Sequence, residues 1–285
     1  MGTRKDGKKR NRGRDLIADS VNVDWAAAGN NTLTPVKNQG SCGSCWAFTA
    51  TTVIESTLAI KAGTKPSRLS EQQLLDCTTN TKDNLEMFGK TYKTFGCRGG
   101  WMPYAYKFYK ENGIMSYEDY PYSSTEQKCQ HDNSKTIGSI GSWGQITENI
   151  DRVKLKLQEQ PLTVAMDASS AAWRYYNSGI IDADDECGES LNHAVVIVGY
   201  TEVGASPPPG PEPTDGDGDG STPVPTPEPT PEPTPKDEDE DGEICSVTKW
   251  WRNCTTPDNG RRLADTQGDE GYWKVQNSWG TSWGD

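Results

Sequence analysis

The chain has 285 residues, a formal net charge of −12 and a hydrophobic content of 32%. Residues 201–243 carry seven Glu and six Asp against one Lys, so the rest of the chain is about neutral and lacks the basic surface typical of nucleic-acid-binding proteins. No apolar run reaches the roughly 18 residues that a transmembrane helix needs. Eight cysteines, an even number, favour an oxidised protein with disulfide bonds.

The first residues differ in composition from those that follow. Residues 1–18 are polar and basic, and they lack the apolar stretch of a secretory signal. We expect them to be a disordered lead-in to a globular domain over residues 19–285, in a chain that is either a mature form or a fragment.

Residues 44–61 have the pattern of a helix. Ser44 is a favourable N-cap residue, and Gly63 is a favourable stop. Apolar residues recur at helical spacing on one predicted face: Ala47, Ala50, Ile54 and Leu58. The sequence therefore predicts an amphipathic helix whose first turn contains Cys45.

Two further helices are predicted in the first half of the chain. LSEQQLLDC, residues 69–77, opens with Ser70 and Gln73 at the spacing of a capping box. MPYAYKFYKENG, residues 102–113, is predicted to end at Gly113. The first half is therefore expected to be mainly helical.

The second half has the composition of β-strands. Residues 161–168 and 193–200 are β-branched and apolar and are flanked by turn residues, and another strand is predicted from residue 271. A helical half followed by a strand-rich half predicts an α+β fold with two lobes.

A long insertion separates the last two predicted strands. Twelve of the 18 prolines lie within residues 201–243. Such a composition cannot bury a core, so we expect a disordered, extended insertion over residues 202–243. We expect a small Cys-containing insertion over residues 244–269, closed by a Cys245–Cys254 disulfide.

The pair Cys42 and Cys45 in NQGSCGSCWAF allows three interpretations. A zinc site needs four Cys or His ligands, but the chain has two histidines and no second Cys-x-x-Cys. A redox pair follows a strand in a βαβ unit, whereas a polar loop precedes this pair. In the third interpretation, Cys45 is a nucleophile whose thiolate is favoured by the first turn of a helix, and Cys42 forms a disulfide.

Five segments, in this order, resemble the papain-like cysteine proteases, the family of papain and the lysosomal cathepsins. They are QGSCGSCWAF, LSEQQLLDC, GCRGGWMPYAY, LNHAVVIVGY and NSWGTSWGD. The resemblance covers the chain from about Val21 to Asp285, except residues 202–269. It implies a helical left lobe, an antiparallel β-barrel right lobe and an active-site cleft between them.

The resemblance implies a role for each active-site residue. Cys45 would be the nucleophile, and His193 would be its general base and acid; their separation of 148 residues is in the range noted for this group. Asn277 would orient the imidazole of His193, and Trp279 would cover that hydrogen bond. Gln39 would donate its side-chain amide to the oxyanion, alongside the backbone N–H of Cys45.

The resemblance also implies a substrate pocket. Gly100 would hold the substrate backbone. Five residues would line the pocket for the second residue before the scissile bond: Trp101, Met102, Ala165, Leu191 and Ala194. This lining is apolar, so we expect a preference for Leu, Val or Phe at that position. The resemblance implies no metal and no cofactor.

Four cysteines match the disulfide-bonded cysteines of the family. The implied pairs are Cys42–Cys97 and Cys77–Cys129. Cys187 matches a cysteine whose partner normally lies near the C-terminus. We therefore expect a truncated chain in which the C-terminal strands of the β lobe are missing.

The implied function is that of a cysteine endopeptidase, which hydrolyses peptide bonds through a thioester acyl-enzyme. The alternative is a non-catalytic relative that binds peptides or partners through the cleft or the acidic insertion. The expected partners are protein or peptide substrates and cystatin-like or propeptide inhibitors, with no nucleic acid and no membrane span. We expect a monomer, located in the lysosome or vacuole or outside the cell. His131, in a polar run, is expected to be a surface residue.

Overall fold

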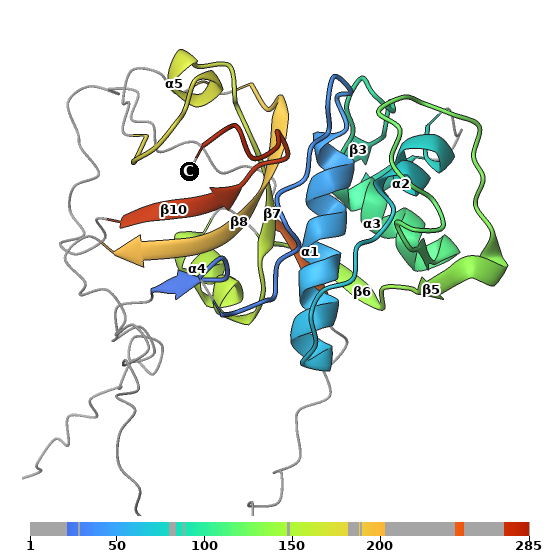
Figure 1. Cartoon of the computed structure of the whole chain (residues 1–285), viewed down its shortest axis with the longest axis horizontal. Helices are drawn as coiled ribbons and strands as arrows, with labels where there is room; N and C mark the ends of the chain where they lie inside the picture. Colours follow the sequence, from blue (N-terminus) through green and yellow to red (C-terminus); the bar gives the residue numbers. More distant parts are fainter. Residues whose placement is uncertain are drawn as a thin grey trace, which may run out of the picture.

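Helix α1 (Cys45–Ala62) lies at the centre of the fold (Figure 1). Helices α2 (Glu71–Cys77) and α3 (Met102–Asn112) lie on one side of it, and the largest sheet lies on the other. The predicted α+β fold with a helical and a strand-rich part is confirmed. The structure, a computed structural model, describes residues 22–27, 29–79, 84–87, 89–146, 149–181, 188, 190–202, 243–247 and 271–284.

Helix α1 is buried on nearly every side, because it separates the other helices from the sheet. It ends as predicted at Gly63, whose φ of 63° lies in the left-handed region that glycine tolerates best. Ala47, Ala50 and Ile54 are fully buried, but Leu58 is 45% exposed. The prediction of a single apolar face is therefore wrong at Leu58. A helix packed between two layers buries polar residues as well, so its burial does not follow one hydrophobic stripe.

Ser44 occupies the N-cap position of α1, but its side chain makes no capping hydrogen bond. Its Oγ lies instead 2.6 Å from the phenolic oxygen of Tyr122. Ser44 therefore lies at the predicted N-cap position, but its side chain does not make the capping hydrogen bond expected there. Cys45, the next residue, is the first residue of the helix.

Helix α2 begins with half of the predicted capping box. Ser70 Oγ accepts a hydrogen bond from the N–H of Gln73 at 2.9 Å. The reciprocal bond does not form, because the N–H of Ser70 bonds to the carbonyl of Met115. The side chain of Gln73 also bonds to Met115, whose backbone N–H donates to Oε1 of Gln73 at 2.9 Å. Gln73 thus ties α2 to strand β4 (Ile114–Met115).

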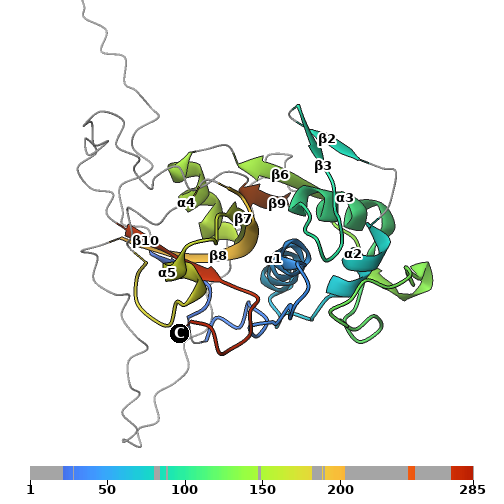
Figure 2. The same ribbon diagram turned by 90° about the horizontal axis from the view of Figure 1, so that it is seen from above.

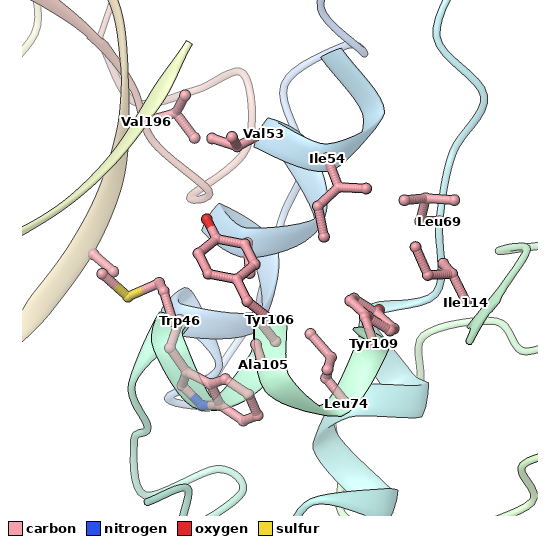
Figure 3. Close-up of a cluster of buried hydrophobic side chains, with 14 of the residues drawn as sticks. Trp46, Val53, Ile54, Leu69, Leu74, Ala105, Tyr106, Tyr109, Ile114 and Val196 are labelled. Atoms are coloured by element: carbon pink, nitrogen blue, oxygen red, sulfur yellow. The ribbon is translucent and has the colours of Figure 1, made fainter. Parts of the chain in front are cut away.

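An apolar core fills the space between α1, α2, α3 and the sheet (Figure 3). It includes Trp46, Val53, Ile54, Leu74, Ala105, Tyr106, Tyr109 and Val196. Each of these side chains is at most 2% exposed. Burial of one large apolar side chain contributes about 1.5–3 kcal/mol, so this core holds the first turns of α1 firmly in place.

The largest sheet has six strands in the order β1–β8–β7–β9–β6, and β10 also pairs with β8. The strands are β1 (Val23–Asp24), β6 (Ser142–Ile146), β7 (Leu162–Met166), β8 (His193–Glu202), β9 (Glu243–Val247) and β10 (Gly271–Gln276). The pairings are antiparallel, except that β9 runs parallel to β6 and to β7. Strand β8 is therefore central to the antiparallel part, and its first residue is His193.

Smaller elements complete the described part of the chain. Figure 2 shows the β2–β3 hairpin beside α3, and α4 close to β7 and β8. The smaller elements are β2 (Leu85–Met87), β3 (Lys90–Tyr92), the 3-10 helix η1 (Asn133–Lys135), β5 (Thr136–Gly138), which pairs with β4, α4 (Ile150–Glu159) and α5 (Ala171–Arg174).

The structure changes the predicted edges of the insertion. Strand β8 runs on to Glu202, and β9 begins at Glu243, so both residues belong to the sheet. The strand at 243–247 was not predicted, because its five residues directly follow a run of acidic residues that is typical of an exposed linker. Four predictions concern positions outside the described residues: the lead-in at 1–18, the disordered insertion over residues 203–242, Cys187, and the Cys245–Cys254 bond, whose second cysteine is not described.

Candidate active site

Cys45 lies where the first turn of α1 meets strand β8. Its side chain is partly exposed. Burial raises the pKa of the Cys45 thiol, and hydrogen bonds from the backbone N–H groups of Ala194, Trp46 and Cys45 itself oppose this effect. Because Ala194 follows His193 directly, the contact from Ala194 brings the cysteine and histidine segments together.

His193 and Asn277 share a hydrogen bond although 84 residues separate them. Nε2 of His193 lies 2.8 Å from Oδ1 of Asn277, and both residues are 7% exposed. The same Oδ1 accepts the backbone N–H of Ser278 at 2.8 Å, which fixes the orientation of the amide. Nε2 must therefore carry a proton and donate it, so Nδ1 of neutral His193 is the basic nitrogen.

Aromatic rings surround the His193 imidazole. The ring of Trp279 lies 4.9 Å from it between centroids, and the ring of Trp173 lies 6.4 Å from it. Burial lowers the pKa of His193, and the hydrogen bond to Asn277 acts in the opposite direction. The rings limit access of water to this hydrogen bond, and a hydrogen bond is stronger in such surroundings.

The side chain of Gln39 is held at both ends of its amide. Nε2 donates to the carbonyl of Cys42 at 2.9 Å, and Oε1 accepts from Ser278 Oγ at 2.7 Å. The backbone N–H of Gln39 also bonds to the carbonyl of Ser278 at 2.9 Å. An amide has two N–H groups, and the bond to Cys42 uses one of them. Ser278 thus connects Gln39 with its chain neighbour Asn277.

The residues predicted to line the substrate pocket belong to the same apolar cluster as Cys45. They are Trp101, Met102, Ala165, Leu191 and Ala194. Ala165 and Ala194 lie opposite each other on β7 and β8. Gly100 passes close to Trp46, because a Cβ added at Gly100 would lie 2.6 Å from the indole ring. Any other residue at this position would displace the ring or the chain.

Both implied disulfides are present, as Cys42–Cys97 and Cys77–Cys129. Because Cys42 is bonded to Cys97, it does not form a redox pair with Cys45. Among the cysteines whose side chains the structure describes, Cys45 is the free one. In the described part of the chain, no three His, Cys, Asp or Glu side chains lie close enough to hold a metal ion. No helix in that part is long and apolar enough to cross a membrane.

The sequence analysis did not identify the residues that support the site from behind. Ser278 lies within the NSWG segment and could have been found there. Tyr122 has no local signal, because it meets Ser44 and Gln39 from about 80 positions further along the chain. His131, expected at the surface, is partly buried and bonds through Nδ1 to the side chain of Gln73 at 2.9 Å.

A sequence model of the papain family cysteine proteases matches residues 20–207, which include Cys45 and His193. The chain belongs to the papain family of cysteine proteases. It is 42% identical over 194 residues to a probable cysteine protease of Arabidopsis thaliana, covering 67% of this chain and 39% of that protein. It is 39% identical over 188 residues to zingipain-2 of Zingiber officinale, covering 65% and 76%. The chain thus spans less than half the length of the Arabidopsis relative.

Solved structures of this family have the same fold. The digestive procathepsin L 3 of Tenebrio molitor larval midgut has a TM-score of 0.61 at 26% identity, covering 95% of this chain and 64% of that one. The bromelain protease of Ananas comosus in complex with an inhibitor has a TM-score of 0.55 at 35% identity, covering 65% and 78%. The predicted two-lobed papain-like fold class is therefore confirmed. Asn277 lies beyond residues 20–207, so its place in the site rests on its hydrogen bond to His193.

Proposed function

We propose that this chain is a cysteine endopeptidase that uses Cys45, His193 and Asn277. The observation that carries the proposal is the arrangement of these three residues. The backbone N–H of Ala194 bonds to the sulfur of Cys45. His193, the residue before Ala194, donates its Nε2–H to Asn277 at 2.8 Å. A nucleophile, a basic nitrogen and a group that orients the base are the parts that covalent catalysis of acyl transfer requires.

Cys45 and His193 would become charged together. Burial alone disfavours both charges, since it raises the pKa of the thiol and lowers the pKa of the imidazole. Transfer of the thiol proton to Nδ1 forms both charges side by side, and their attraction offsets the cost of burial. The backbone N–H groups at the start of α1 further favour the thiolate.

The reaction then proceeds in two acyl-transfer steps. The thiolate attacks the peptide carbonyl, and the resulting oxyanion accepts hydrogen bonds from the Gln39 side chain and the Cys45 backbone N–H. The tetrahedral species collapses to a thioester as His193 gives its proton to the departing amine. Water, deprotonated by His193, hydrolyses the thioester and restores the Cys45 thiol.

The apolar cluster beside Cys45 supports a specificity proposal. Met102, Ala165 and Ala194 offer no charged or hydrogen-bonding side chain, and Trp101 and Leu191 pack against them. Such a lining favours Leu, Val or Phe at the second residue before the scissile bond, because a charged side chain would lose its hydration without gaining a partner.

Membership of the family supports proposals about partners and location. Protein substrates and regulation by propeptide or cystatin-like inhibitors are part of this proposal. A monomer in a lysosome or vacuole, or outside the cell, is also part of it. Two disulfides, Cys42–Cys97 and Cys77–Cys129, agree with an oxidising compartment.

Hydrolysis of fluorogenic peptides tests the proposed function and separates it from peptide binding without catalysis. The full chain would be assayed at mildly acidic pH with a thiol reductant, using peptides that carry Leu, Phe, Asp or Lys at the second position before the scissile bond. We expect faster hydrolysis of the Leu and Phe peptides, and a loss of about 10³-fold or more in the Cys45→Ser variant. If the wild type bound peptides without hydrolysing them, the proposed peptidase activity would be refuted and the binding-only alternative supported.

A further inference from the structure

The two proposed oxyanion donors stand on separate segments of the chain. One is the side-chain amide of Gln39, in the loop before α1, and the other is the backbone N–H of Cys45, at the start of α1. Both must point to one oxygen atom within a few tenths of an ångström, because the strength of a hydrogen bond depends steeply on its distance and angle. Some contact must therefore fix the loop relative to the helix.

Tyr122 makes that contact. Its hydroxyl donates to the backbone carbonyl of Gln39 at 2.8 Å and lies 2.6 Å from Oγ of Ser44. A phenolic hydroxyl has one hydrogen, and Gln39 receives it, so Ser44 is the donor in the second bond. The Tyr122 oxygen thus connects Gln39, which supplies one oxyanion donor, with Ser44, the residue before Cys45, which supplies the other.

Ser44 gives an independent indication of this role. It stands at the N-cap of α1, where serine normally bonds to a backbone N–H of the first turn, yet it makes no such bond. A missing cap costs about 1 kcal/mol of helix stability. Departures from local preference of this kind concentrate at functional sites, where another requirement overrides them. Here Ser44 Oγ bonds to Tyr122 instead.

We propose that Tyr122 is a positioning residue for the oxyanion hole, which sets the position of Gln39 relative to the N–H of Cys45. The inference rests on the proposed function and assigns a role to a side chain whose hydroxyl bonds to Gln39 and Ser44. Ser278 holds the side chain of Gln39 through Oγ and its backbone N–H through a carbonyl, whereas Tyr122 holds its backbone carbonyl, so the contacts restrain different groups of one residue.

The surroundings of Tyr122 suit this role. The ring of Phe48, on the first turn of α1, meets the Tyr122 ring edge to face at 4.7 Å between centroids. Gly40, at φ 62°, lets the loop approach so closely that an added Cβ would lie 3.0 Å from Ser124 Oγ. Burial raises the pKa of Tyr122, so its hydroxyl keeps the proton that it donates to Gln39 at every pH where the enzyme would work.

Tyr122→Phe removes the hydroxyl and keeps the ring contact with Phe48. We expect kcat for peptide hydrolysis to fall about 10-fold with KM nearly unchanged, because the oxyanion exists in the transition state and not in the bound substrate. Alkylation of Cys45 by iodoacetamide forms no oxyanion, so its rate constant should stay within about twofold of wild type. A merely structural role for Tyr122 would lower both rates together.

Two further variants complete the experiment. In a Gln39→Ala background, Tyr122→Phe should reduce kcat by less than about twofold, since the donor that it positions is gone. Tyr120→Phe is the matched control, because it removes a buried hydroxyl that bonds to Asp76 and not to the active site, and kcat should not change. Ser44→Ala removes the second bond of the Tyr122 hydroxyl and should lower kcat even if Tyr122→Phe does not fold.

The outcomes distinguish this inference from the proposed function. A wild-type chain that hydrolyses no peptide overturns both. A wild type that is active, with kcat unchanged in Tyr122→Phe and Ser44→Ala, overturns the positioning role alone. So does an equal loss of kcat from Tyr122→Phe with and without Gln39, because the two residues would then act independently.

Discussion

Lys37 is buried with two carboxylates, and we predict that its removal strongly destabilises the fold. Its side chain is 4% exposed, and Nζ lies 2.7 Å from Oε1 of Glu55 and 2.7 Å from Oε1 of Glu71. Both glutamate side chains are fully buried. A second cation, Arg68, lies 3.7 Å from Oε2 of Glu71. Lys37→Met fills a similar volume and leaves the two carboxylates facing each other.

The magnitude follows from the burial. Removal of one partner from a buried ion pair costs about 3–5 kcal/mol. One carboxyl can take up a proton and Arg68 remains nearby, so we expect a loss near the lower end, about 3 kcal/mol. For a domain of 150–250 residues, each kcal/mol lowers the melting temperature by about 2–4 °C. Lys37→Met should therefore melt about 6–12 °C below its parent.

Thermal unfolding followed by far-ultraviolet circular dichroism at pH 7 measures this effect. All chains would carry Cys45→Ser, so that self-digestion cannot alter the transition. The control is Lys107→Met, because the Lys107–Glu111 pair lies at the surface of α3, with nitrogen and oxygen 2.6 Å apart. Such a pair is worth about 0.5 kcal/mol, so the control should melt within about 2 °C of the parent. An equally small shift for Lys37→Met would refute the reasoning about buried charge.

Two predictions concern pH. Burial lowers the pKa of His193, and the hydrogen bond that His193 donates to Asn277 opposes this effect. Asn277→Ala should therefore lower that pKa further and move the alkaline limb of the kcat/KM profile to lower pH; an unmoved limb would show that Asn277 does not act through the imidazole. Burial raises the pKa of Glu55 above its value in the unfolded chain, although Lys37 opposes this shift, so folding makes protonation of this carboxylate easier. The resulting contribution to stability is present below the unfolded value, about 4.3, and is lost as pH rises through the folded value. Relative to Glu55→Gln, the wild type should therefore lose unfolding free energy in denaturant titrations as pH rises above about 4; a difference independent of pH would contradict this.

Local patterns predicted the elements whose causes are local. Gly63 ends α1 because a left-handed C-cap favours glycine, and Gly113 ends α3. The predictions failed where a distant segment decides the contact. Leu58 stays exposed on a helix that is buried elsewhere, and Ser44 stays at the N-cap position but bonds to Tyr122 instead of to the helix. The residues next to Leu58 and Ser44 in the sequence do not show which distant segments will pack against them.

The same distinction applies to the site. Short motifs named Cys45, His193 and Asn277 because their local patterns are specific. The hydrogen bonds that orient them join residues far apart in the chain, such as Ser278 Oγ to Gln39 Oε1 over 239 positions. Residues that hold a catalytic group in place, unlike the group itself, need no particular local pattern. They become visible only when the fold brings their segments together.

The most direct test of the account is to label the active site with an epoxysuccinyl peptide, a thiol-directed inhibitor. The full chain would be treated at mildly acidic pH, and the modified residue would be mapped by mass spectrometry, with Cys45→Ser and His193→Ala as controls. We predict one label per chain, on Cys45, no label in Cys45→Ser and much slower labelling in His193→Ala, because the imidazole activates the thiol. A folded wild-type chain that takes up no label, or that is labelled at Cys45 equally fast without His193, would contradict the proposed catalytic site.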